Sequence, residues 1–292
     1  MTRNRSLAGL LFFLFAASLF SSCTHLFYQP GKEQYFDPGK MGMVYQDAWI
    51  ESAGGRKLHA WLFPSVGETP ERGTIIQFHG NAENISSHFA SLAWVTKRGY
   101  NFIAFDYSGY WNSDGEPGQK ALNEDSLSAL TYAYKFNQTR SQETGNKLSL
   151  SAYGQSLGGA VLLRALADYP LRGELNAVVI ESSFYSYQTI AREKLGLSWI
   201  TWLFQPLAYV LVSDEYAPEK VIGSLSGTRL LVIHGTDDKV VPIRHGRRIF
   251  ELAKEPKTFW EVQGGRHIDS MTRHGKEYRD KLIAYLDEAG AK

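Results

Sequence analysis

The sequence predicts an α/β fold in which a mostly parallel central sheet is flanked by helices. Short apolar runs, typical of strands buried on both faces, alternate along the chain with segments of helical spacing. Strands that alternate with helices favour parallel pairing through right-handed crossovers. The 292 residues are 43% hydrophobic, which is enough to build one large core.

The expected elements follow one another from about residue 43 to residue 289. Two strands at 43–52 and 57–65 flank a turn at Ala53–Gly54–Gly55. Further strands are expected at 73–80, 101–107, 147–154, 176–183, 229–235 and 257–263. Helices are expected at 84–98, 119–138, 156–169, 243–254 and 275–289. The first of these helices is indicated by the spacing of Ile85, Phe89, Leu92 and Val95.

Residues 184–226 lie between two strands and are long for a crossover. They contain the aromatic-rich stretch LGLSWITWLFQPLAYVLVSDEY, which two arrangements would explain equally well. The segment forms a small lid over a pocket, or it is a plain crossover whose aromatic side chains pack on the sheet. A membrane hairpin is disfavoured because Pro206 and the polar ends interrupt the stretch.

The N-terminal segment differs in composition from the rest of the chain. Arg3 and Arg5 precede an apolar run from Leu7 to Phe20, and small residues then lead to Cys23. These are the parts of a secretory signal, and the run is shorter than the roughly 20 residues of a membrane span. Because Cys23 is the only cysteine, no disulfide forms within the chain.

The position of Cys23 directly after FSS resembles the lipobox of bacterial lipoproteins, in which the cysteine is lipidated and becomes the mature N-terminus. We therefore expect a signal peptide at 1–22, a lipid-anchored linker at 23–43 and the main domain at 44–292. The protein is then exported and held at a membrane of the bacterial cell envelope. The alternatives are an N-terminal membrane anchor and an ordinary signal peptide with an incidental cysteine.

A glycine-rich turn joins the strand expected at 147–154 to the helix that follows it. Its sequence Gly154-Gln155-Ser156-Leu157-Gly158 matches the pattern G-x-S-x-G. A serine on such a strand-to-helix turn projects its hydroxyl, and the first N–H groups of the helix point at whatever it attacks. The pattern predicts Ser156 as a nucleophile, and the alternative is a serine that only caps the helix.

A serine hydroxyl needs a base, and an acid followed by a histidine is the chain order that this kind of turn predicts. Asp237 and Asp238 follow the strand at 229–235, and His267 follows the last strand. His267 would take the proton from the serine and return it to the leaving group, while the acid holds the imidazole in one tautomer. Residue chemistry does not separate the two aspartates, because either can form an Asx turn. A loop histidine satisfied by backbone groups is the alternative for His267.

A tetrahedral intermediate also needs N–H donors for its oxyanion. One is expected from the backbone of Leu157, and the other from the loop QFHGNAEN after the strand at 73–80. Gly80 permits a tight turn there, which frees the N–H of Asn81 or Ala82. His79 is expected to support this loop.

Four motifs together resemble the α/β-hydrolase superfamily, in particular its serine-aminopeptidase-like and prolyl-oligopeptidase-like group of small esterases and lipases. The family's oxyanion loop resembles HGNAEN, and its segment D-Y-R-G-Y-G-x-S-x-G-x-P resembles FDYSGYWNSDGEP. The family motif H-G-x-x-D-x-x-V-P resembles HGTDDKVVP, and its glycine–histidine loop resembles GGRHID. The resemblance covers residues 44–289, implies the α/β-hydrolase fold and selects Asp238 as the acid. Ser108 and Trp111 replace an arginine and a glycine of the family. Trp111 is expected to reshape the pocket rim, so the substrate preference does not carry over.

The resemblance implies a serine hydrolase that cleaves carboxylic esters of acyl groups. Peptidase or amidase activity and acyl transfer use the same triad and are alternatives, whereas a catalytically silent binding lipoprotein would lack a triad residue, and none is missing. The net charge of +1 and the absence of a lysine/arginine block give no indication of nucleic acid. No histidine spacing typical of a metal site and no G-x-G-x-x-G pattern is present, so no metal or organic cofactor is expected. The expected partners are an acyl ester or peptide substrate and, through the lipid anchor, a membrane.

Overall fold

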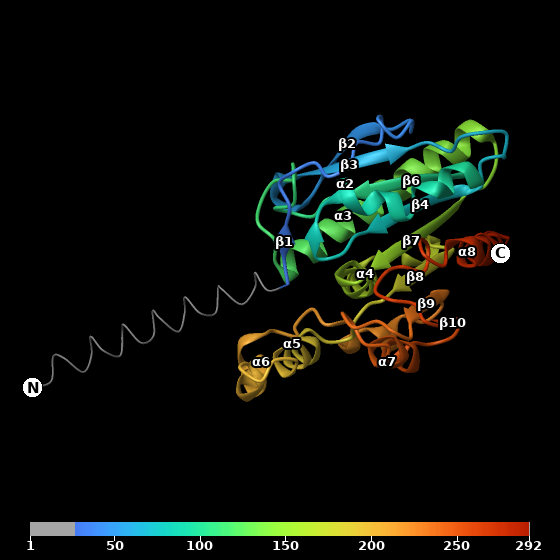
Figure 1. Cartoon of the computed structure of the whole chain (residues 1–292). Helices are drawn as coiled ribbons and strands as arrows, with labels where there is room; N and C mark the ends of the chain where they lie inside the picture. Colours follow the sequence, from blue (N-terminus) through green and yellow to red (C-terminus); the bar gives the residue numbers. More distant parts are fainter. Residues whose placement is uncertain (1–26, 292) are drawn as a thin grey trace, which may run out of the picture.

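Eight strands form one central sheet in the computed structural model, which describes residues 27–291 (Figure 1). The strands are β2 (Gln46–Glu51), β3 (Lys57–Phe63), β4 (Gly73–Phe78), β6 (Tyr100–Phe105), β7 (Ser149–Gln155), β8 (Ala177–Glu181), β9 (Leu230–Gly235) and β10 (Lys257–Val262). Their order across the sheet is β10-β9-β8-β7-β4-β6-β3-β2. The pairings of β3 with β2 and with β6 are antiparallel and the others are parallel, which confirms the predicted fold class.

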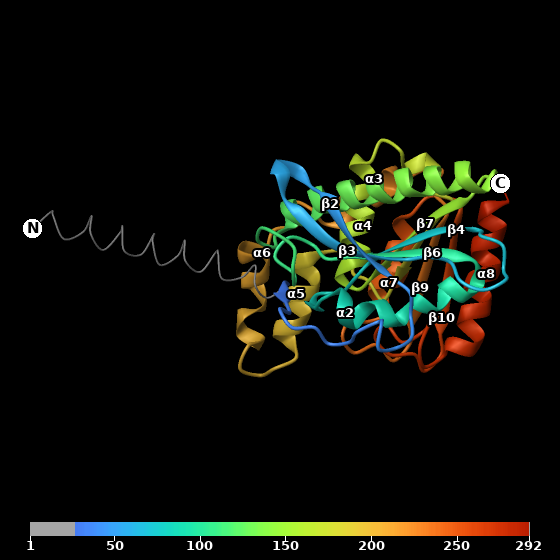
Figure 2. The ribbon, with the colours of Figure 1, turned by 90° about the horizontal axis from the view of Figure 1, so that it is seen from above.

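Helices cover both faces of this sheet (Figure 2). They are α2 (Ile85–His88), α3 (Gln119–Thr144), α4 (Leu157–Asp168), α5 (Tyr187–Gly196), α6 (Ala208–Leu211), α7 (Arg244–Leu252) and α8 (Gly275–Gly290). Helices α3, α4 and α7 share one hydrophobic core, and α2 and α8 share another on the opposite face. Successive strand residues point to opposite faces, so Ile76 enters the first core and Ile75 the second. Both faces are buried, which explains the continuous apolar runs.

The helix expected at 84–98 is interrupted in the structure. Only α2 is α-helical, and 3₁₀ turns follow at Phe89–Ser91 and Ala93–Arg98. The buried side chains of Phe89, Leu92 and Val95 are spaced by three residues. A 3₁₀ helix has three residues per turn and places such residues on one face. The core therefore favours the tighter helix over the expected continuous one.

The body of the protein begins earlier than the boundary expected at residue 44. Tyr28 is buried in the core, and β1 (Gln29–Pro30) pairs in parallel with β5 (Ala82–Glu83) in a second, two-stranded sheet. Residues 27–31 are therefore part of the folded body, whereas most of residues 32–42 are exposed. The expected signal peptide and Cys23 lie outside the described residues. No helix between residues 27 and 291 has the length and apolar character that crossing a bilayer requires.

The segment 184–226 forms α5, a 3₁₀ helix at Trp202–Leu207, α6 and two short 3₁₀ turns at Pro218–Lys220 and Ile222–Ser224. One of the two expected arrangements, a crossover whose aromatic side chains pack on the sheet, is not what the structure shows. Trp199 is 87% exposed and Trp202 is 58% exposed. Figure 2 shows α5 and α6 projecting to one side of the sheet.

Candidate active site

Ser156 occupies a sharp turn between β7 and α4. Its backbone has φ 53° and ψ −118°, a conformation that L residues rarely adopt. The two segments joined by the turn pack so closely that glycine is required. A Cβ on Gly158 would lie 2.1 Å from the Phe78 carbonyl oxygen, and one on Gly154 would lie 2.6 Å from the Cα of Gly159. The glycines therefore let the first turn of α4 pack against β4 and β7.

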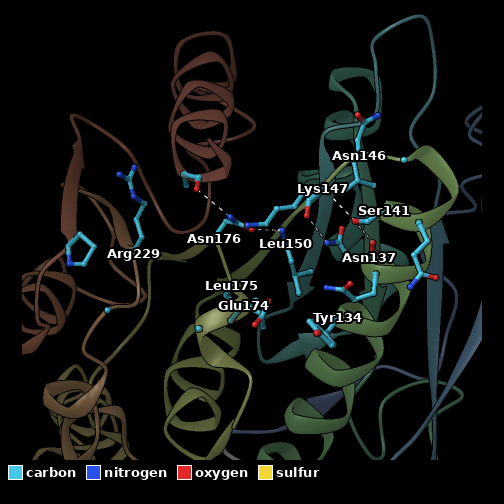
Figure 3. A pocket seen from close by; sticks show the side chains of 18 residues that line it. Tyr134, Asn137, Ser141, Asn146, Lys147, Leu150, Glu174, Leu175, Asn176 and Arg229 are labelled. Carbon is cyan, nitrogen blue, oxygen red and sulfur yellow. Dashed lines mark hydrogen bonds between the residues drawn. The ribbon is translucent and has the colours of Figure 1, made fainter. Parts of the chain in front are cut away.

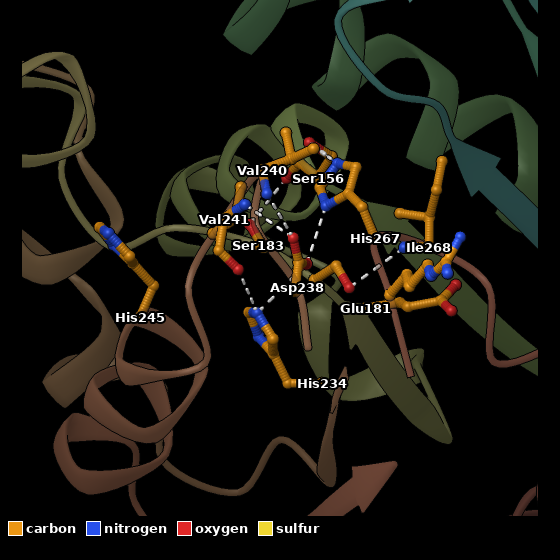
Figure 4. A network of polar contacts seen from close by, with 12 residues as sticks. Ser156, Glu181, Ser183, His234, Asp238, Val240, Val241, His245, His267 and Ile268 are labelled. Carbon is orange, nitrogen blue, oxygen red and sulfur yellow. Dashed lines mark hydrogen bonds and ion pairs between the residues drawn. The ribbon is translucent and has the colours of Figure 1, made fainter. Parts of the chain in front are cut away.

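The structure brings together the three side chains predicted from distant parts of the sequence (Figure 4). Nδ1 of His267 lies 2.8 Å from Oδ2 of Asp238, and Nε2 of His267 lies 3.0 Å from Oγ of Ser156. Because an ionised carboxylate only accepts, the imidazole proton belongs on Nδ1. Nε2 is then free to accept the serine proton, as a general base requires.

Asp238, and not Asp237, contacts His267. Oδ1 of Asp238 accepts hydrogen bonds of 2.8 Å from the amides of Val240 and Val241, while Asp237 is exposed. Burial alone would raise the pKa of Asp238, but hydrogen bonds from His234, His267 and the Val241 amide hold it well below its usual range. The carboxylate beside His267 therefore stays ionised at neutral pH. This geometry agrees with the acid that the H-G-x-x-D-x-x-V-P motif selects.

The loop after β4 closes over Ser156. A Cβ on Gly80 would lie 3.7 Å from Cβ of Ser156, so this loop runs directly beside the nucleophile. The ring of His79 contacts the Gly80 carbonyl at 2.8 Å and Asp106 at 3.3 Å, consistent with a supporting role. The Tyr110 hydroxyl donates to the Asn81 carbonyl at 2.6 Å. This bond also fixes the orientation of the Ala82 N–H, which belongs to the same planar peptide group as the Asn81 carbonyl.

The three amides expected to bind an oxyanion lie in residues that line one pocket with Ser156. They are Leu157, at the start of α4, and Asn81 and Ala82, in the loop after β4. Within residues 27–291, the amides of Asn81 and Leu157 donate no hydrogen bond to a backbone carbonyl. The His88 ring is neutral, because burial and the neighbouring His79 lower the pKa of His88 to about 4. Nε2 of this ring donates to the Ala82 carbonyl at 2.9 Å.

Glu181 is a buried residue of this region that the sequence analysis missed. Its backbone carbonyl accepts the amide of Ser156 at 2.9 Å. Its carboxylate accepts hydrogen bonds from the Tyr153 hydroxyl at 2.9 Å, the Gln155 amide at 2.8 Å, the Ser270 amide at 3.1 Å and the Ser270 hydroxyl. One carboxylate therefore ties β7, which carries Ser156, to the loop that carries His267. A charged residue at the end of an otherwise apolar strand is the signal that could have identified it.

Two further strained residues lie beside Glu181 and His267. Ser182 has φ 52° and Ile268 has φ 48°, and the Ile268 amide donates to the Ser182 hydroxyl at 3.2 Å. A positive φ is a clear outlier for a β-branched residue such as isoleucine. Such conformations cost about 1–3 kcal/mol each and cluster at functional sites. Ser156, Ser182 and Ile268 are thus three residues with strained backbones close to the nucleophile.

A mostly apolar cavity of about 320 Å³ opens beside Ser156 and His267. Its apolar walls come from Phe27, Phe184, Ile190, Ala191, Val240, Val241 and Ile268. Lys194 of α5 is the one lysine, arginine or acidic residue among its lining residues. Burial lowers the pKa of this amine, although Asp238 and Glu193 favour its charged form. Trp111, expected at the pocket rim, is not among the lining residues. The centroid of its ring lies 5.0 Å from that of His59 and 5.4 Å from that of Trp61.

A larger cavity of about 660 Å³ lies at the opposite, amino ends of the strands (Figure 3). Its polar side chains are engaged within the fold: Asn137 donates to the Leu148 carbonyl, Asn176 to the Ala289 carbonyl and Arg229 to Glu288. It is remote from Ser156 and has no cluster of reactive groups. Among residues 27–291, no group of three or more histidine, cysteine or acidic residues is arranged to hold a metal ion.

Comparisons with known proteins agree with this architecture. The profile of a family described as "Serine aminopeptidase, S33" matches residues 69–226. The uncharacterized protein YfhR of Escherichia coli is 32% identical over 294 residues, which cover 97% of this chain and 95% of that protein. The α/β-hydrolase domain-containing protein WAV2 of Arabidopsis thaliana is 28% identical, covering 86% and 81% of the two chains.

Two solved structures share the fold at low sequence identity. An esterase of Pyrococcus furiosus superimposes with a TM-score of 0.68 at 19% identity, covering 89% of this chain and 97% of that one. The protein Est1E of Butyrivibrio proteoclasticus, solved with bound ferulic acid, gives a TM-score of 0.65 at 19% identity, with coverage of 84% of this chain and 100% of that one.

The contacts of Glu181 lead to a prediction about the position of His267. Glu181→Gln replaces one acceptor oxygen by N–H donors that face other donors, which shifts the loop through Ser270. We expect kcat for an activated ester such as p-nitrophenyl acetate to fall at least about tenfold with little change in KM, because small displacements of catalytic groups are costly. The exposed Glu68→Gln serves as the matched control. A folded Glu181→Gln protein with unchanged kcat would show that this contact does not position His267.

Proposed function

Because the chain belongs to the serine aminopeptidase family of the α/β-hydrolase superfamily, we propose that it is a serine hydrolase that cleaves carboxylic esters of acyl groups. The observation that supports this most is the continuous row of hydrogen bonds from Asp238 through His267 to Ser156. This row ends at a pocket whose walls are mostly apolar. An acyl chain fits such walls, while the ester carbonyl lies at the serine.

The reaction proceeds in two half-reactions with the same groups. Oγ of Ser156 attacks the ester carbonyl carbon as its proton passes to Nε2 of His267, and Asp238 stabilises the imidazolium. The amides of Leu157 and of Asn81 or Ala82 bind the developing oxyanion. When the tetrahedral intermediate collapses, the C–O bond breaks and His267 protonates the departing alcohol. His267 then deprotonates water, which attacks the acyl-enzyme carbonyl carbon. As the C–Oγ bond breaks, His267 returns the proton to Ser156 and the carboxylic acid is released.

The charge in the pocket favours an acyl ester over a peptide with a free amino terminus. An aminopeptidase needs an anionic partner for the substrate ammonium group, because a buried unpaired charge is costly. Among the described residues that line the pocket there is no aspartate or glutamate, and Lys194 supplies a positive charge instead. A substrate ammonium group would therefore be repelled, whereas an uncharged acyl chain would not.

The proposed location follows from the N-terminal sequence. The signal-like segment before Cys23 supports export, and the lone cysteine after FSS supports attachment of lipid at its sulfur. The mature protein then begins at Cys23, only four residues before the first described residue, Phe27. The hydrolase domain is thus held close to a membrane of the cell envelope.

Acyl-chain dependence tests the proposed reaction. Each methylene that the pocket buries contributes about 0.8 kcal/mol, so kcat/KM for p-nitrophenyl esters should rise roughly fourfold per added carbon until the cavity is filled. Steady-state kinetics from acetate to long acyl chains measures this. Ser156→Ala should abolish hydrolysis at every length. Ester hydrolysis that survives Ser156→Ala, or no hydrolysis of any ester, would contradict the proposal.

A matched pair of substrates separates esterase from aminopeptidase within the same experiment. The p-nitrophenyl esters of leucine and of 4-methylpentanoic acid differ only in the α-amino group. With Lys194 in the pocket, we expect the ester without the amino group to be preferred. Lys194→Gln should narrow the difference. A preference for the leucine ester would instead favour peptidase activity.

The proposed lipid anchor is tested by the mass of the protein extracted from membranes of a bacterium that processes lipoproteins. We expect residues 1–22 to be absent and Cys23 to carry acyl groups, because the lipobox-like sequence directs cleavage before this cysteine. Cys23→Ser should remain unprocessed. An intact Met1, or a Cys23 without added mass, would rule out the anchor.

A further inference from the structure

Exposed apolar side chains are concentrated on the segment between α5 and the end of α6. Nine of the fifteen large apolar side chains exposed among the described residues lie there, so this exposure is concentrated in one segment of the chain. We call these nine residues the 197–210 patch: Leu197, Trp199, Ile200, Trp202, Leu203, Phe204, Leu207, Tyr209 and Val210. Single exposed apolar residues are normal, but a contiguous patch marks an interaction surface.

The residue composition of the patch is typical of protein surfaces that lie at a membrane–water interface. Residues 195–212 contain no charged side chain, and two tryptophans and a tyrosine are among the exposed members. Tryptophan and tyrosine combine an apolar ring with a polar group and are enriched at the level of lipid headgroups. At the edge of the patch, the guanidinium of Arg192 lies 5.9 Å from the ring of Tyr209. A cation at this position can contact anionic lipid headgroups.

The patch lies next to the pocket that contains Ser156. Helix α5 packs against both the 3₁₀ helix at Trp202–Leu207 and α6, and these carry most of the patch. The same helix contributes Ile190, Ala191 and Lys194 to the pocket wall. Figure 2 shows this group standing out from the sheet. A surface covering the patch would therefore lie one helix away from the candidate nucleophile.

The start of the described chain brings any N-terminal anchor to the same place. The ring of Phe27 lies 5.3 Å from Tyr187 and 6.4 Å from Phe184, at the base of α5. Phe27 lies four residues after Cys23 in the sequence, and four steps of at most about 3.5 Å each give a reach of about 14 Å. A lipid on Cys23, or an apolar run at 7–20 inserted in a bilayer, would hold the base of α5 close to the membrane surface. This tether favours lipid over a second copy of the chain.

We propose that the 197–210 patch docks on a lipid bilayer, with Trp199 and Trp202 at the depth of the headgroups and upper acyl chains. The docking is peripheral, because no helix of the described chain can span the bilayer. It places the mouth of the pocket toward the membrane, so that acyl esters of the bilayer can enter from it. The docking rests in part on the proposed anchor, and only its consequence for substrate entry rests on the proposed esterase activity.

Fluorescence quenching by brominated lipids tests the docking on the full chain. The Ser156→Ala protein is reconstituted in vesicles of phosphatidylcholine and phosphatidylglycerol, with or without bromine near the glycerol end of the acyl chains. We expect bromine to quench tryptophan fluorescence. The quenched component should disappear in the variant that also carries Trp199→Phe and Trp202→Phe.

The matched control is Trp49→Phe. Trp49 is 52% exposed, but it lies on the edge strand β2 and not on the patch. This variant should keep the quenched component. If bromine leaves the fluorescence of Trp199 and Trp202 unchanged, the patch is covered by something other than lipid, such as a second copy or the chain's own N-terminal segment, and the proposal is wrong.

Activity provides a second arm in the protein with Ser156 intact. Trp199→Ser combined with Leu203→Ser should lower hydrolysis of esters presented in vesicles at least about tenfold, because each change removes a large apolar side chain from the bilayer. Hydrolysis of a soluble short ester should be unchanged. Equal vesicle activity of variant and wild type would overturn the role in substrate entry. If the wild type hydrolyses no soluble ester, the esterase proposal is wrong. The quenching result would still test the docking.

Discussion

The close packing of α4 on β4 and β7 is the constraint on which the candidate site depends. With no side chain at Gly158, the first turn of α4 reaches the Phe78 carbonyl, and the chain must turn sharply at Ser156 to get there. The turn directs the serine hydroxyl out of the sheet and the free amides of the helix toward the same space. The strain at Ser156 is sustained by two buried cores that hold the strand and the helix in place.

The parallel sheet then determines what else reaches Ser156. The carboxyl ends of β4, β7, β8, β9 and β10 meet at one edge, so the loops after them converge although they are far apart in sequence. Asp238 comes from the loop after β9 and His267 from the loop after β10. Glu181, at the end of β8, connects the loop that carries His267 to β7 through buried hydrogen bonds. Insertion of α5 and α6 after β8 adds the pocket wall and the exposed 197–210 patch at this same edge.

The sequence was sufficient for features set by local pattern and chain order. Apolar runs located the strands, and the G-x-S-x-G turn with the later aspartate and histidine predicted residues that the fold brings within hydrogen-bonding distance. Features set by tertiary packing were missed. The three-residue spacing of Phe89, Leu92 and Val95 fits both kinds of helix until the core is known. Glu181 has no motif, since its partners come from other strands, and the exposure of Trp199 depends on how the insertion leaves the sheet.

The rate at which a fluorophosphonate probe modifies Ser156 tests the central claim most directly, when the adduct is located by peptide mass spectrometry. The account predicts one adduct, on Ser156, forming at similar rates in the wild type and in Asp237→Asn. In Asp238→Asn it should form at least about a thousandfold more slowly, because the imidazole loses the partner that fixes its tautomer. An adduct on another residue, or equal rates for Asp237→Asn and Asp238→Asn, would contradict it.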